Sequence, residues 1–170
     1  MLNDADLERY ARQVIMPHVG EDGQEKLLGA KVLVVGAGGL GAPVIFYLAA
    51  AGIGHITIID DDMVSSTDLN RQIIYKDIDI GLSKSKQAVK AASALNPDIS
   101  ILQHATSLNT DNVQSLLTNH DLVIDCTDNA ETRYLIGDAA HRYARPLVFG
   151  GAVRMEGQVS VFQSGVKGYE

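Results

Sequence analysis

The chain has 170 residues, of which 46% are hydrophobic, and 21 acidic against 14 basic residues give it a formal net charge of −7. This length and composition predict one ordered domain over residues 1–170 and exclude an intrinsically disordered chain. The excess of acidic residues argues against a surface that binds nucleic acid, and no stretch reaches the roughly 20 apolar residues of a membrane span. The single cysteine excludes a disulfide framework. We therefore expect a cytoplasmic protein without nucleic-acid or membrane partners.

The first predicted element is a helix that Asp4 can cap and that ends before Pro17. Its apolar positions follow the helical period: Leu7, Tyr10, Ala11, Val14 and Ile15. Arg9 and Arg12 lie three residues apart on another face, and this spacing alone favours an ordinary solvated helix surface. A short segment over residues 23–28 then leads into the first strand.

A glycine-rich turn follows the first predicted strand, which is an apolar run over residues 31–35. Gly36, Gly38 and Gly41 fit the pattern G-x-G-x-x-G. Glycines permit a tight turn and a close backbone approach, and the N–H groups that open the next helix attract an anion. The turn therefore predicts a phosphate-binding element.

The helix after this turn is expected to run to about Ala51, and residues 55–59 predict a second strand that ends on the aspartate run 60–62. Asp60 lies 19 residues beyond Gly41, near the spacing at which a carboxylate meets a ribose hydroxyl in dinucleotide-binding units. Enzymes that use NAD, FAD or ATP share such a unit. On this unit alone, a nicotinamide cofactor is the first interpretation.

Residues 63–82 show no helix or strand period, and this connection is longer than the usual loop of an α/β unit. Long ordered loops are more often functional than idle. Arg71 lies in this connection, and Lys84 opens the helix that follows it. Both cations are therefore expected near the carboxyl end of the sheet, where ligands bind in open α/β folds.

The remainder of the chain alternates strands with helices. Its predicted elements are a helix over residues 83–95, a strand over 99–103, a short helix over 111–117, a strand over 121–126, a helix over 130–143, a strand over 146–149, and a hairpin over 152–163 that turns near Glu156-Gly157. Together these elements predict a Rossmann-like, doubly wound α/β fold, with a mostly parallel sheet flanked by helices and a C-terminal β-hairpin.

Three polar side chains favour a triphosphate over a nicotinamide cofactor. Arg71 and Lys84 are fixed cations of the kind that spread the charge of a leaving pyrophosphate. Asp128 follows a predicted strand and can hold a magnesium ion that bridges phosphate oxygens. A cofactor that only lends a hydride needs neither feature.

The chain resembles a known family, the MoeB/ThiF (HesA/MoeB/ThiF) adenylyltransferases, which are related to ubiquitin-activating enzymes. The motifs that carry the resemblance cover nearly the whole chain: Arg9-Tyr-Ala-Arg-Gln13, Asp22-Gly-Gln24, Gly36 to Gly41, Ala51-Gly-Ile-Gly54, Asp60 to Asp62, Leu69-Asn-Arg-Gln72, Lys84, Asn96-Pro97, Asp125-Cys-Thr-Asp-Asn129 and Arg154-Met-Glu-Gly-Gln158. Several motifs in order and at family spacing are far more specific than the glycine pattern alone.

The resemblance implies ATP-dependent adenylation of the C-terminal glycine of a small ubiquitin-like sulfur carrier ending in Gly-Gly, as in molybdopterin or thiamine biosynthesis. By family role, Asp60 faces the ribose, Arg71 and Lys84 face the phosphates, and Asp128 binds magnesium. Arg12 looks like the arginine that such enzymes lend to the ATP of the partner subunit, which implies a homodimer. The nucleotide-binding set implied by the resemblance is Gly36, Gly38, Gly39, Gly41, Asp60, Asp62, Thr67, Asp68, Leu69, Asn70, Arg71, Lys84, Asp128 and Asn129.

Two features depart from the family pattern. Asp68 stands where the family usually has asparagine; its carboxylate can either repel the phosphates or help to hold magnesium, and the sequence leaves both open. Family members also continue with Cys-x-x-Cys zinc ligands and a cysteine for sulfur transfer or carrier linkage, whereas this chain ends at Glu170. We therefore favour a truncated member, in which any zinc belongs to the absent part, over a natural short form whose reaction ends at the adenylate.

Two other functions remain open from the sequence. An NAD-dependent oxidoreductase is supported only by the unit from Gly36 to Asp60. A nucleotide-binding dimeric scaffold with little or no turnover is supported by Asp68 and by the absent C-terminal part. Cys126 lies in a predicted buried strand without a basic neighbour in sequence, which favours core packing over a nucleophilic role.

Overall fold

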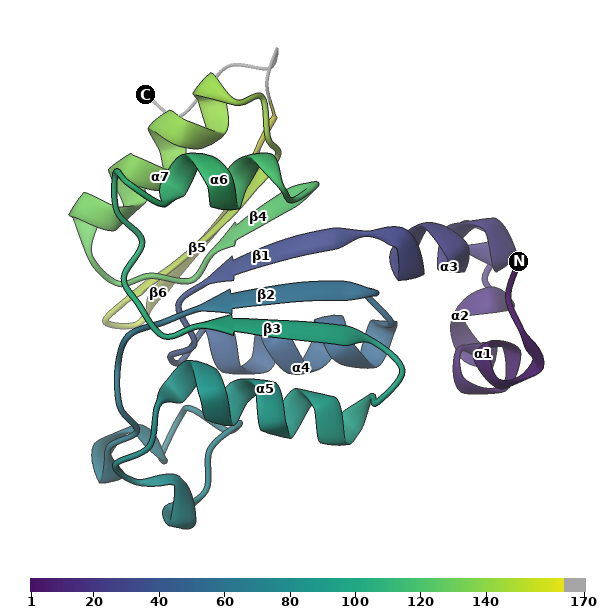
Figure 1. The fold of residues 1–170 in the computed structure, drawn as a ribbon, viewed down its shortest axis with the longest axis horizontal. Coiled ribbons are helices and arrows are strands. Elements are labelled where there is room, and N and C mark those ends of the chain that lie inside the picture. Colours follow the sequence, from purple (N-terminus) through teal and green to yellow (C-terminus); the bar gives the residue numbers. More distant parts are fainter. Residues whose placement is uncertain (164–170) are drawn as a thin grey trace.

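We describe residues 1–163 from a computed structural model, in which a six-stranded sheet has helices on both faces (Figure 1). The strands follow the order β3-β2-β1-β4-β5-β6, and every neighbouring pair is parallel except the antiparallel pair β5 and β6. Their bounds are β1 Lys31–Val35, β2 His55–Ile59, β3 Ser100–His104, β4 Leu122–Asp125, β5 Leu147–Val153 and β6 Glu156–Phe162. This arrangement confirms the predicted Rossmann-like fold with a C-terminal hairpin.

The sheet separates two apolar cores, each covered by a different pair of helices (Figure 1). Helices α4 (Gly41–Ala51) and α5 (Lys84–Leu95) pack with Val32, Val34, Ile56 and Ile58 on one face. Helices α6 (Val113–Thr118) and α7 (Ala130–Arg142) pack with Leu33, Val35, Val123 and Leu147 on the other. Strands β1, β2 and β4 read as apolar runs because both of their faces are buried.

The register of the strands aligns their carboxyl ends. Val35, the last residue of β1, pairs with Ile59 of β2 on one side and with Asp125 of β4 on the other. The chain leaves β1 toward β2 and later crosses back to β4, so the strand order reverses on either side of β1. A crevice for ligands is expected at this point in open α/β sheets.

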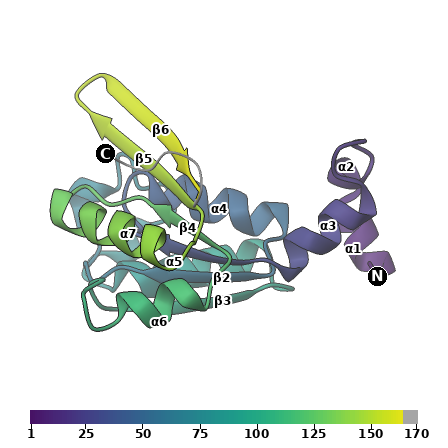
Figure 2. The same ribbon diagram turned by 90° about the horizontal axis from the view of Figure 1, so that it is seen from above.

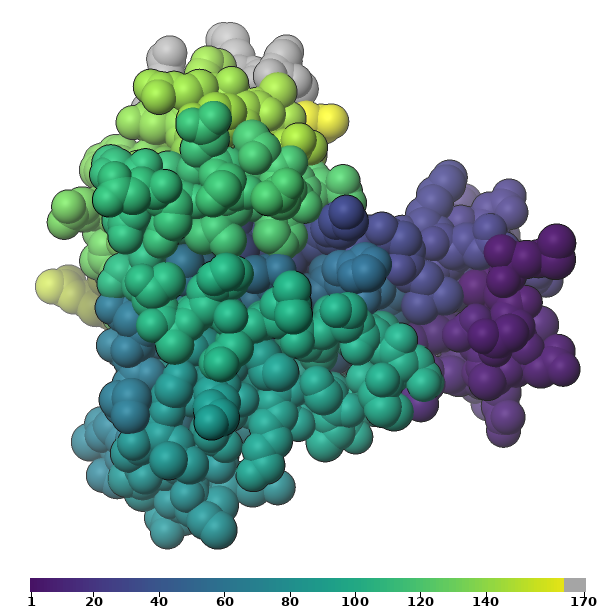
Figure 3. All heavy atoms as spheres, viewed as in Figure 1, coloured from purple at the N-terminus to yellow at the C-terminus, as the bar shows by residue number. Residues whose placement is uncertain are grey.

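The N-terminal residues form a lobe beside the sheet, built from α1 (Asp4–Arg9), α2 (Ala11–Val14) and α3 (Gly20–Gly29), as Figures 1 and 3 show. The prediction of one helix capped by Asp4 was wrong. Asn3 is the N-cap of α1, and the helix breaks at Tyr10. Tyr10 is only 2% exposed and its hydroxyl accepts a hydrogen bond of 2.8 Å from Asn96 Nδ2. The buried ring and its hydrogen bond thus lie at the break between α1 and α2.

Helix α3 was predicted only as a short segment. Its single buried residue is Gln24, so the helix has no apolar stripe that a sequence pattern would show. Gln24 Nε2 donates to the carbonyl of Ala51, and Gln24 Oε1 accepts from Gln13 Nε2. The lobe is thus attached to the end of α4 by amide hydrogen bonds.

The hairpin also differs from its prediction. Strand β5 runs unbroken through Gly150 and Gly151 to Val153, and the turn lies at Arg154 and Met155 rather than at Glu156-Gly157. Arg154 has a φ of +56°. Figure 2 shows the hairpin extending away from the rest of the sheet. Between residues 1 and 163, no helix is long and apolar enough to cross a membrane.

Candidate functional site

A cavity of about 760 Å³ lies at the carboxyl ends of β1, β2 and β4. Its walls come from the glycine turn, the aspartate run 60–62, the connection before α5, and the segment between β4 and α7. The predicted residues that line it are Gly36, Gly38, Gly39, Asp60, Asp62, Asp68, Arg71, Lys84, Asp128 and Asn129. Thus the structure brings together side chains that lie far apart in sequence.

The path of the glycine turn is forced by close backbone contacts. Gly36 has a φ of +92°, and a Cβ atom there would lie 2.9 Å from the carbonyl oxygen of Cys126. A Cβ atom at Gly41 would lie 2.0 Å from the carbonyl oxygen of Gly36. At Gly39 the nearest atoms are those of the Arg71 side chain, 3.6 Å or more away. Gly36 and Gly41 therefore shape the turn, whereas Gly39 keeps its surface open to the cavity.

Asp60 holds this turn in place. Its Oδ2 accepts a hydrogen bond of 2.7 Å from the N–H of Ala37, and its Oδ1 accepts one of 2.9 Å from the N–H of Asp62. Burial raises the pKa of Asp60 above its ordinary value of 3.8, although these two bonds and the charge of Lys84 oppose the shift. The hydroxyl of Tyr75 donates to the carbonyl of Ala37, so both the N–H and the carbonyl of Ala37 are held in place.

Lys84 is a buried cation, only 6% exposed. Its Nζ donates to Asp62 Oδ2 at 2.8 Å and lies 3.6 Å from Asp68 Oδ2. Burial alone lowers the pKa of Lys84, but the bond to Asp62 and the charges of Asp60 and Asp68 outweigh it, so the pKa is raised above 10.5. Lys84 stays charged at neutral pH.

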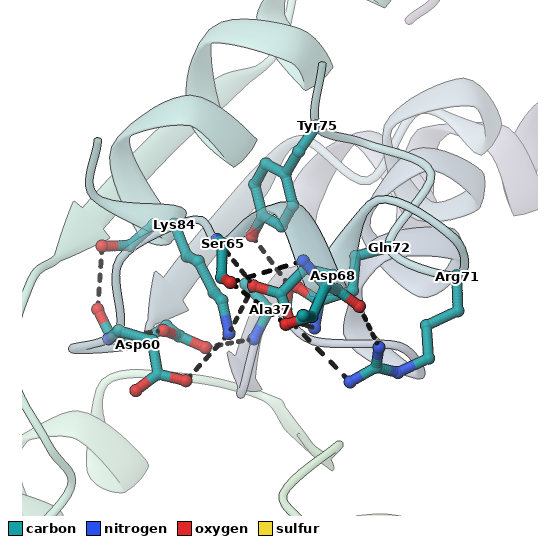
Figure 4. A network of polar contacts seen from close by, with 11 residues as sticks. Ala37, Asp60, Ser65, Asp68, Arg71, Gln72, Tyr75 and Lys84 are labelled. Carbon is teal, nitrogen blue, oxygen red and sulfur yellow. Dashed lines mark hydrogen bonds and ion pairs between the residues drawn. The ribbon is translucent and has the colours of Figure 1, made fainter. Parts of the chain in front are cut away.

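Asp68 has a structural role that the sequence did not predict (Figure 4). It is 7% exposed and its Oδ2 accepts from the N–H of Ser65, which caps the 3₁₀ turn η1 (Ser66–Asp68). Its Oδ1 accepts from Gln72 Nε2 at 2.9 Å. The carboxylate therefore folds the connection as well as placing a negative charge between Lys84 and Arg71.

Arg71 is exposed and is oriented by its own loop. Its Nη1 donates to the carbonyl of Thr67 and to Asn70 Oδ1, and its Nη2 lies 3.8 Å from Asp68 Oδ1. Thr67 and Asn70 do not line the cavity, and neither does Leu69, which packs against the core. These three residues support Arg71 and the loop rather than facing the cavity.

The segment after β4 supplies the opposite side of the cavity. Asp128 lines it with an exposed side chain, whereas Asn129 Oδ1 accepts from the N–H of Thr132 and caps α7. Asp125 is only 1% exposed, and its Oδ1 accepts from the N–H and hydroxyl of Thr127, which holds the start of this segment. Burial raises the pKa of Cys126 to about 12, which agrees with the predicted packing role.

Arg12 does not line the cavity of its own chain. It lies on α2, a helix of the N-terminal lobe (Figure 1). Its side chain is exposed. Arg9 forms an ion pair of 3.1 Å with Asp98 and thus joins the lobe to the start of β3. The structure therefore does not bring Arg12 together with the other predicted site residues.

Sequence reasoning missed several cavity residues. Thr106, Ser107 and Leu108 line the cavity after β3, and Ser107 donates to Asp61 Oδ2. The rule that loops after parallel strands meet at one edge would have found them. Arg133 also lines the cavity from α7. Its only sequence signal is a basic residue near the N-terminal end of a helix, where the helix dipole disfavours positive charge.

Comparison with known proteins gives a consistent picture. The model of the ThiF family matches residues 10–169. A sulfur carrier protein adenylyltransferase of Thermus thermophilus is 46% identical over 157 residues, which are 92% of this chain and 58% of that protein. An adenylyltransferase and sulfurtransferase MOCS3 of Culex quinquefasciatus is 46% identical over 161 residues, which are 95% of this chain and 37% of that protein.

Solved structures share the fold. The tRNA N6-threonylcarbamoyladenosine dehydratase TcdA of E. coli, solved in complex with ATP, superposes with a TM-score of 0.83 at 30% identity, over 89% of this chain and 63% of that chain. The chain spans little more than half of one curated relative and little more than a third of the other. Their names give no support to an NAD-dependent oxidoreductase.

Proposed function

The chain belongs to the ThiF family, and we propose that it adenylates the C-terminal carboxylate of a small ubiquitin-like sulfur carrier with ATP. The observation that carries this proposal is the convergence of Lys84, Arg71 and Asp128 on the glycine turn in one cavity. The Thermus relative is named for this reaction. The E. coli structural neighbour was solved with ATP, which supports ATP as the nucleotide.

The reaction is an attack of a carboxylate oxygen on the α-phosphorus of ATP. A new P–O bond forms, the bond to the bridging oxygen of pyrophosphate breaks, and pyrophosphate leaves with the electron pair. Negative charge grows on the leaving group, and the fixed cations Lys84 and Arg71 stabilise it. The backbone N–H groups that open α4 supply further anion binding beside Gly39.

Asp60 is proposed as the ribose ligand. Its two carboxylate oxygens are already oriented by the N–H groups of Ala37 and Asp62, which fixes the plane of the carboxylate. Each oxygen retains a lone pair that can accept from a ribose hydroxyl. The same bonds couple ribose binding to the position of the glycine turn.

Asp128 is proposed as a magnesium ligand. Its carboxylate is exposed at the cavity, and within residues 1–163 it takes part in no hydrogen bond or ion pair. Magnesium ions are usually bound through one or two carboxylates together with phosphates and water, which this side chain fits. When bound, the ion would neutralise charge on the phosphate oxygens.

A homodimer is proposed as the active form. Arg12 lies on the lobe, away from the cavity of its own chain, and Ile15 and Met16 beside it are 69% and 45% exposed. Apolar side chains next to an exposed arginine suit a protein contact. A second copy could bring Arg12 to the phosphates, as in the family role.

The test is carrier-dependent exchange of labelled pyrophosphate into ATP by the full-length protein. We expect Lys84→Ala and Asp128→Ala to lower exchange by about 100-fold or more. Lys86→Ala and Asp138→Ala are matched controls because the two residues lie on α5 and α7 and neither lines the cavity. No exchange with any ubiquitin-like carrier would contradict the proposal. Binding of ATP and carrier without adenylate would instead indicate the scaffold.

A further inference from the structure

Arg133 is a cavity cation that the roles above leave unused. It lies near the N-terminal end of α7, and its side chain lines the cavity together with Asp128 and Ala152. Helices α5 and α7 cover opposite faces of the sheet, so Arg133 reaches the cavity from a different side than Lys84 (Figure 1). The cavity therefore has cations on two sides.

The guanidinium of Arg133 is held in one orientation. Its Nε and Nη2 both donate to the carbonyl of Thr127, at 3.2 Å and 2.5 Å, and its Cζ lies 5.0 Å from the centre of the Phe149 ring. Stacking on an aromatic face and two bonds along one edge fix the plane of the group. Binding an anion would therefore cost little side-chain entropy.

The other edge of this guanidinium remains available. Among residues 1–163, Nη1 has no hydrogen-bond partner and Arg133 forms no ion pair, whereas Lys84 and Arg71 each pair with Asp68. Nη1 lies over Gly151 of β5, 3.6 Å from the position that a Cβ atom would take there. Gly150 precedes it, and a Cβ atom there would meet Leu40 Cδ1 at 3.6 Å and the carbonyl oxygen of Asp125 at 3.7 Å. Strand β5 thus has two successive positions without side chains just before Ala152, which lines the cavity. Glycines within strands often mark places where another backbone approaches closely.

The proposed reaction brings two anions together, a triphosphate and a carboxylate. Unless each anion has its own cation, their repulsion opposes the approach. Lys84 and Arg71 belong to the phosphate side, near Gly39. A planar guanidinium with one free edge matches the geometry of a carboxylate.

We propose that Arg133 binds the C-terminal carboxylate of the carrier tail and orients it for attack, with the last glycines of the tail lying along Gly150 and Gly151. This inference rests on the proposed function, since it assigns a position to the carrier within the same cavity. A purely structural role for Arg133 would need only the bonds to Thr127 and the contact with Phe149. The two roles predict different responses to the charge of the tail.

The experiment compares two forms of one ubiquitin-like sulfur carrier, one ending in a free carboxylate and one ending in a carboxamide. Binding to the full-length protein is measured by calorimetry without ATP. We expect the wild type to bind the carboxylate form about tenfold or more tightly than the carboxamide form, as for a charge-assisted hydrogen bond. In Arg133→Gln, which can still donate to the carbonyl of Thr127, both forms should bind within about twofold of each other.

Arg142→Gln is the matched control, because Arg142 is exposed on the same helix and does not line the cavity. It should keep the full preference for the carboxylate. The Arg133→Gln variant should raise KM for the carrier while leaving the affinity for ATP unchanged, and Arg133→Lys should keep part of the preference.

The inference would be overturned if the Arg133→Gln protein still bound the carboxylate form about tenfold more tightly than the carboxamide form. The proposed function would stand in that case, provided that the wild type exchanges pyrophosphate. Equal binding of the two carriers by the wild type would overturn it without any variant, so a folding defect in a variant leaves the inference testable. If the wild type makes no adenylate with any carrier, the proposed function and the inference fail together.

Discussion

Lys84 and Asp68 form a buried ion pair, with Nζ and Oδ2 3.6 Å apart and each side chain at most 10% exposed. Asp68 also lies 3.8 Å from Arg71. The two cations assigned to the phosphates therefore share one carboxylate, which reduces the positive charge that a triphosphate meets. The sequence left open whether Asp68 repels phosphate or helps to hold magnesium.

We predict that Asp68→Asn strengthens ATP binding by a few fold and leaves pyrophosphate exchange equal or higher. Removal of the negative charge frees Lys84 and Arg71 to interact with phosphate. The side-chain oxygen of the new asparagine could still accept from the N–H of Ser65. The bond from Gln72 Nε2 to Oδ1 of residue 68 is lost, but once the Gln72 side-chain amide turns over, its Oε1 can accept from the new Nδ2. In the wild type this buried oxygen has no hydrogen-bond partner among the described residues. The measurement is ATP titration with and without magnesium.

Asp68→Ala is the comparison variant. It removes the side-chain acceptor that Asp68 offers to the N–H of Ser65, the N-cap of η1, and should lower the free energy of unfolding by about 0.5 to 2 kcal/mol. Asp68→Asn keeps an acceptor there and avoids this cost. Weaker ATP binding by Asp68→Asn in the presence of magnesium, but not in its absence, would instead indicate that Asp68 is a metal ligand.

Gly39 and Gly41 should respond differently to alanine, although both belong to the glycine turn. A Cβ atom at Gly41 would lie 2.0 Å from the carbonyl oxygen of Gly36, so Gly41→Ala should destabilise the fold by about 3 kcal/mol or more. At Gly39 the nearest neighbour is the flexible Arg71 side chain at 3.6 Å, so Gly39→Ala should fold normally. Its methyl group faces the cavity and should weaken ATP binding about tenfold.

Thermal unfolding and ATP titration of the two variants separate these effects. Gly137→Ala serves as the control because Gly137 lies in α7 and a Cβ atom there has no neighbour within 4 Å. Its stability should equal or slightly exceed that of the wild type, since alanine favours a helix more than glycine. Normal ATP binding by Gly39→Ala would show that the nucleotide does not approach this part of the turn.

His120 predicts a pH dependence of stability. It is buried, its Nδ1 donates to the carbonyl of Leu116 at 2.5 Å, and its Nε2 accepts from the hydroxyl of Thr57 at 2.7 Å. Burial lowers the pKa of His120 below 6.5, although the bond to Leu116 and the charge of Asp121 oppose the shift. Below pH 6.5 the unfolded state therefore binds more protons than the folded state, and the free energy of unfolding falls as the pH drops.

The slope of the free energy of unfolding against pH is measured by denaturant unfolding between about pH 5 and 8, a range that brackets the ordinary pKa of histidine. His120→Gln should be less stable at neutral pH. Its free energy of unfolding should no longer show the part of the fall below pH 6.5 that protonation of His120 causes. His18→Gln, which changes an exposed histidine of the lobe, should retain it. An unchanged slope in His120→Gln would rule out His120 as its source.

Much of the site followed from the sequence because simple rules govern it. Strands buried on both faces read as apolar runs, and carboxyl ends of parallel strands meet at one edge. These rules predict that Asp60, Lys84 and Asp128 lie close together, and the cavity contains all three. Their roles toward a nucleotide remain predictions.

The rest depended on contacts that no local pattern encodes. Asp68 caps an aperiodic loop, so its burial follows from the folding of the whole connection and not from its neighbours in sequence. Helix α3 buries Gln24 instead of an apolar stripe. Arg133 reaches the cavity only because α7 packs beside β5, and its Nη1 lies near Gly151, 18 residues later in the chain.

A final prediction tests whether Arg12 acts on the cavity of a second copy. As pure dimers, Arg12→Ala and Lys84→Ala should each lower pyrophosphate exchange by about 100-fold or more. A mixed dimer, however, contains one site in which Lys84 is intact and the partner supplies Arg12. Random exchange of equal amounts makes about half of the dimers mixed, each with one working site of two, so exchange should recover to about a quarter of the wild-type value.

The control is a mixture of Lys84→Ala with Asp128→Ala. Both of these residues line the cavity of their own chain, so a mixed dimer of the two variants has no intact site and should stay inactive. Recovery should also require that the subunits exchange. Co-expression with two different affinity tags and purification of the doubly tagged dimer would secure this, and because every purified dimer is then mixed, exchange should reach about half of the wild-type value. If the Arg12→Ala and Lys84→Ala mixture stays as inactive as the control, Arg12 does not act across a dimer. Full pyrophosphate exchange by the Arg12→Ala dimer would also contradict this role. Arg12 would then be an ordinary residue of the solvated helix surface, since it lies on the lobe and does not line the cavity of its own chain.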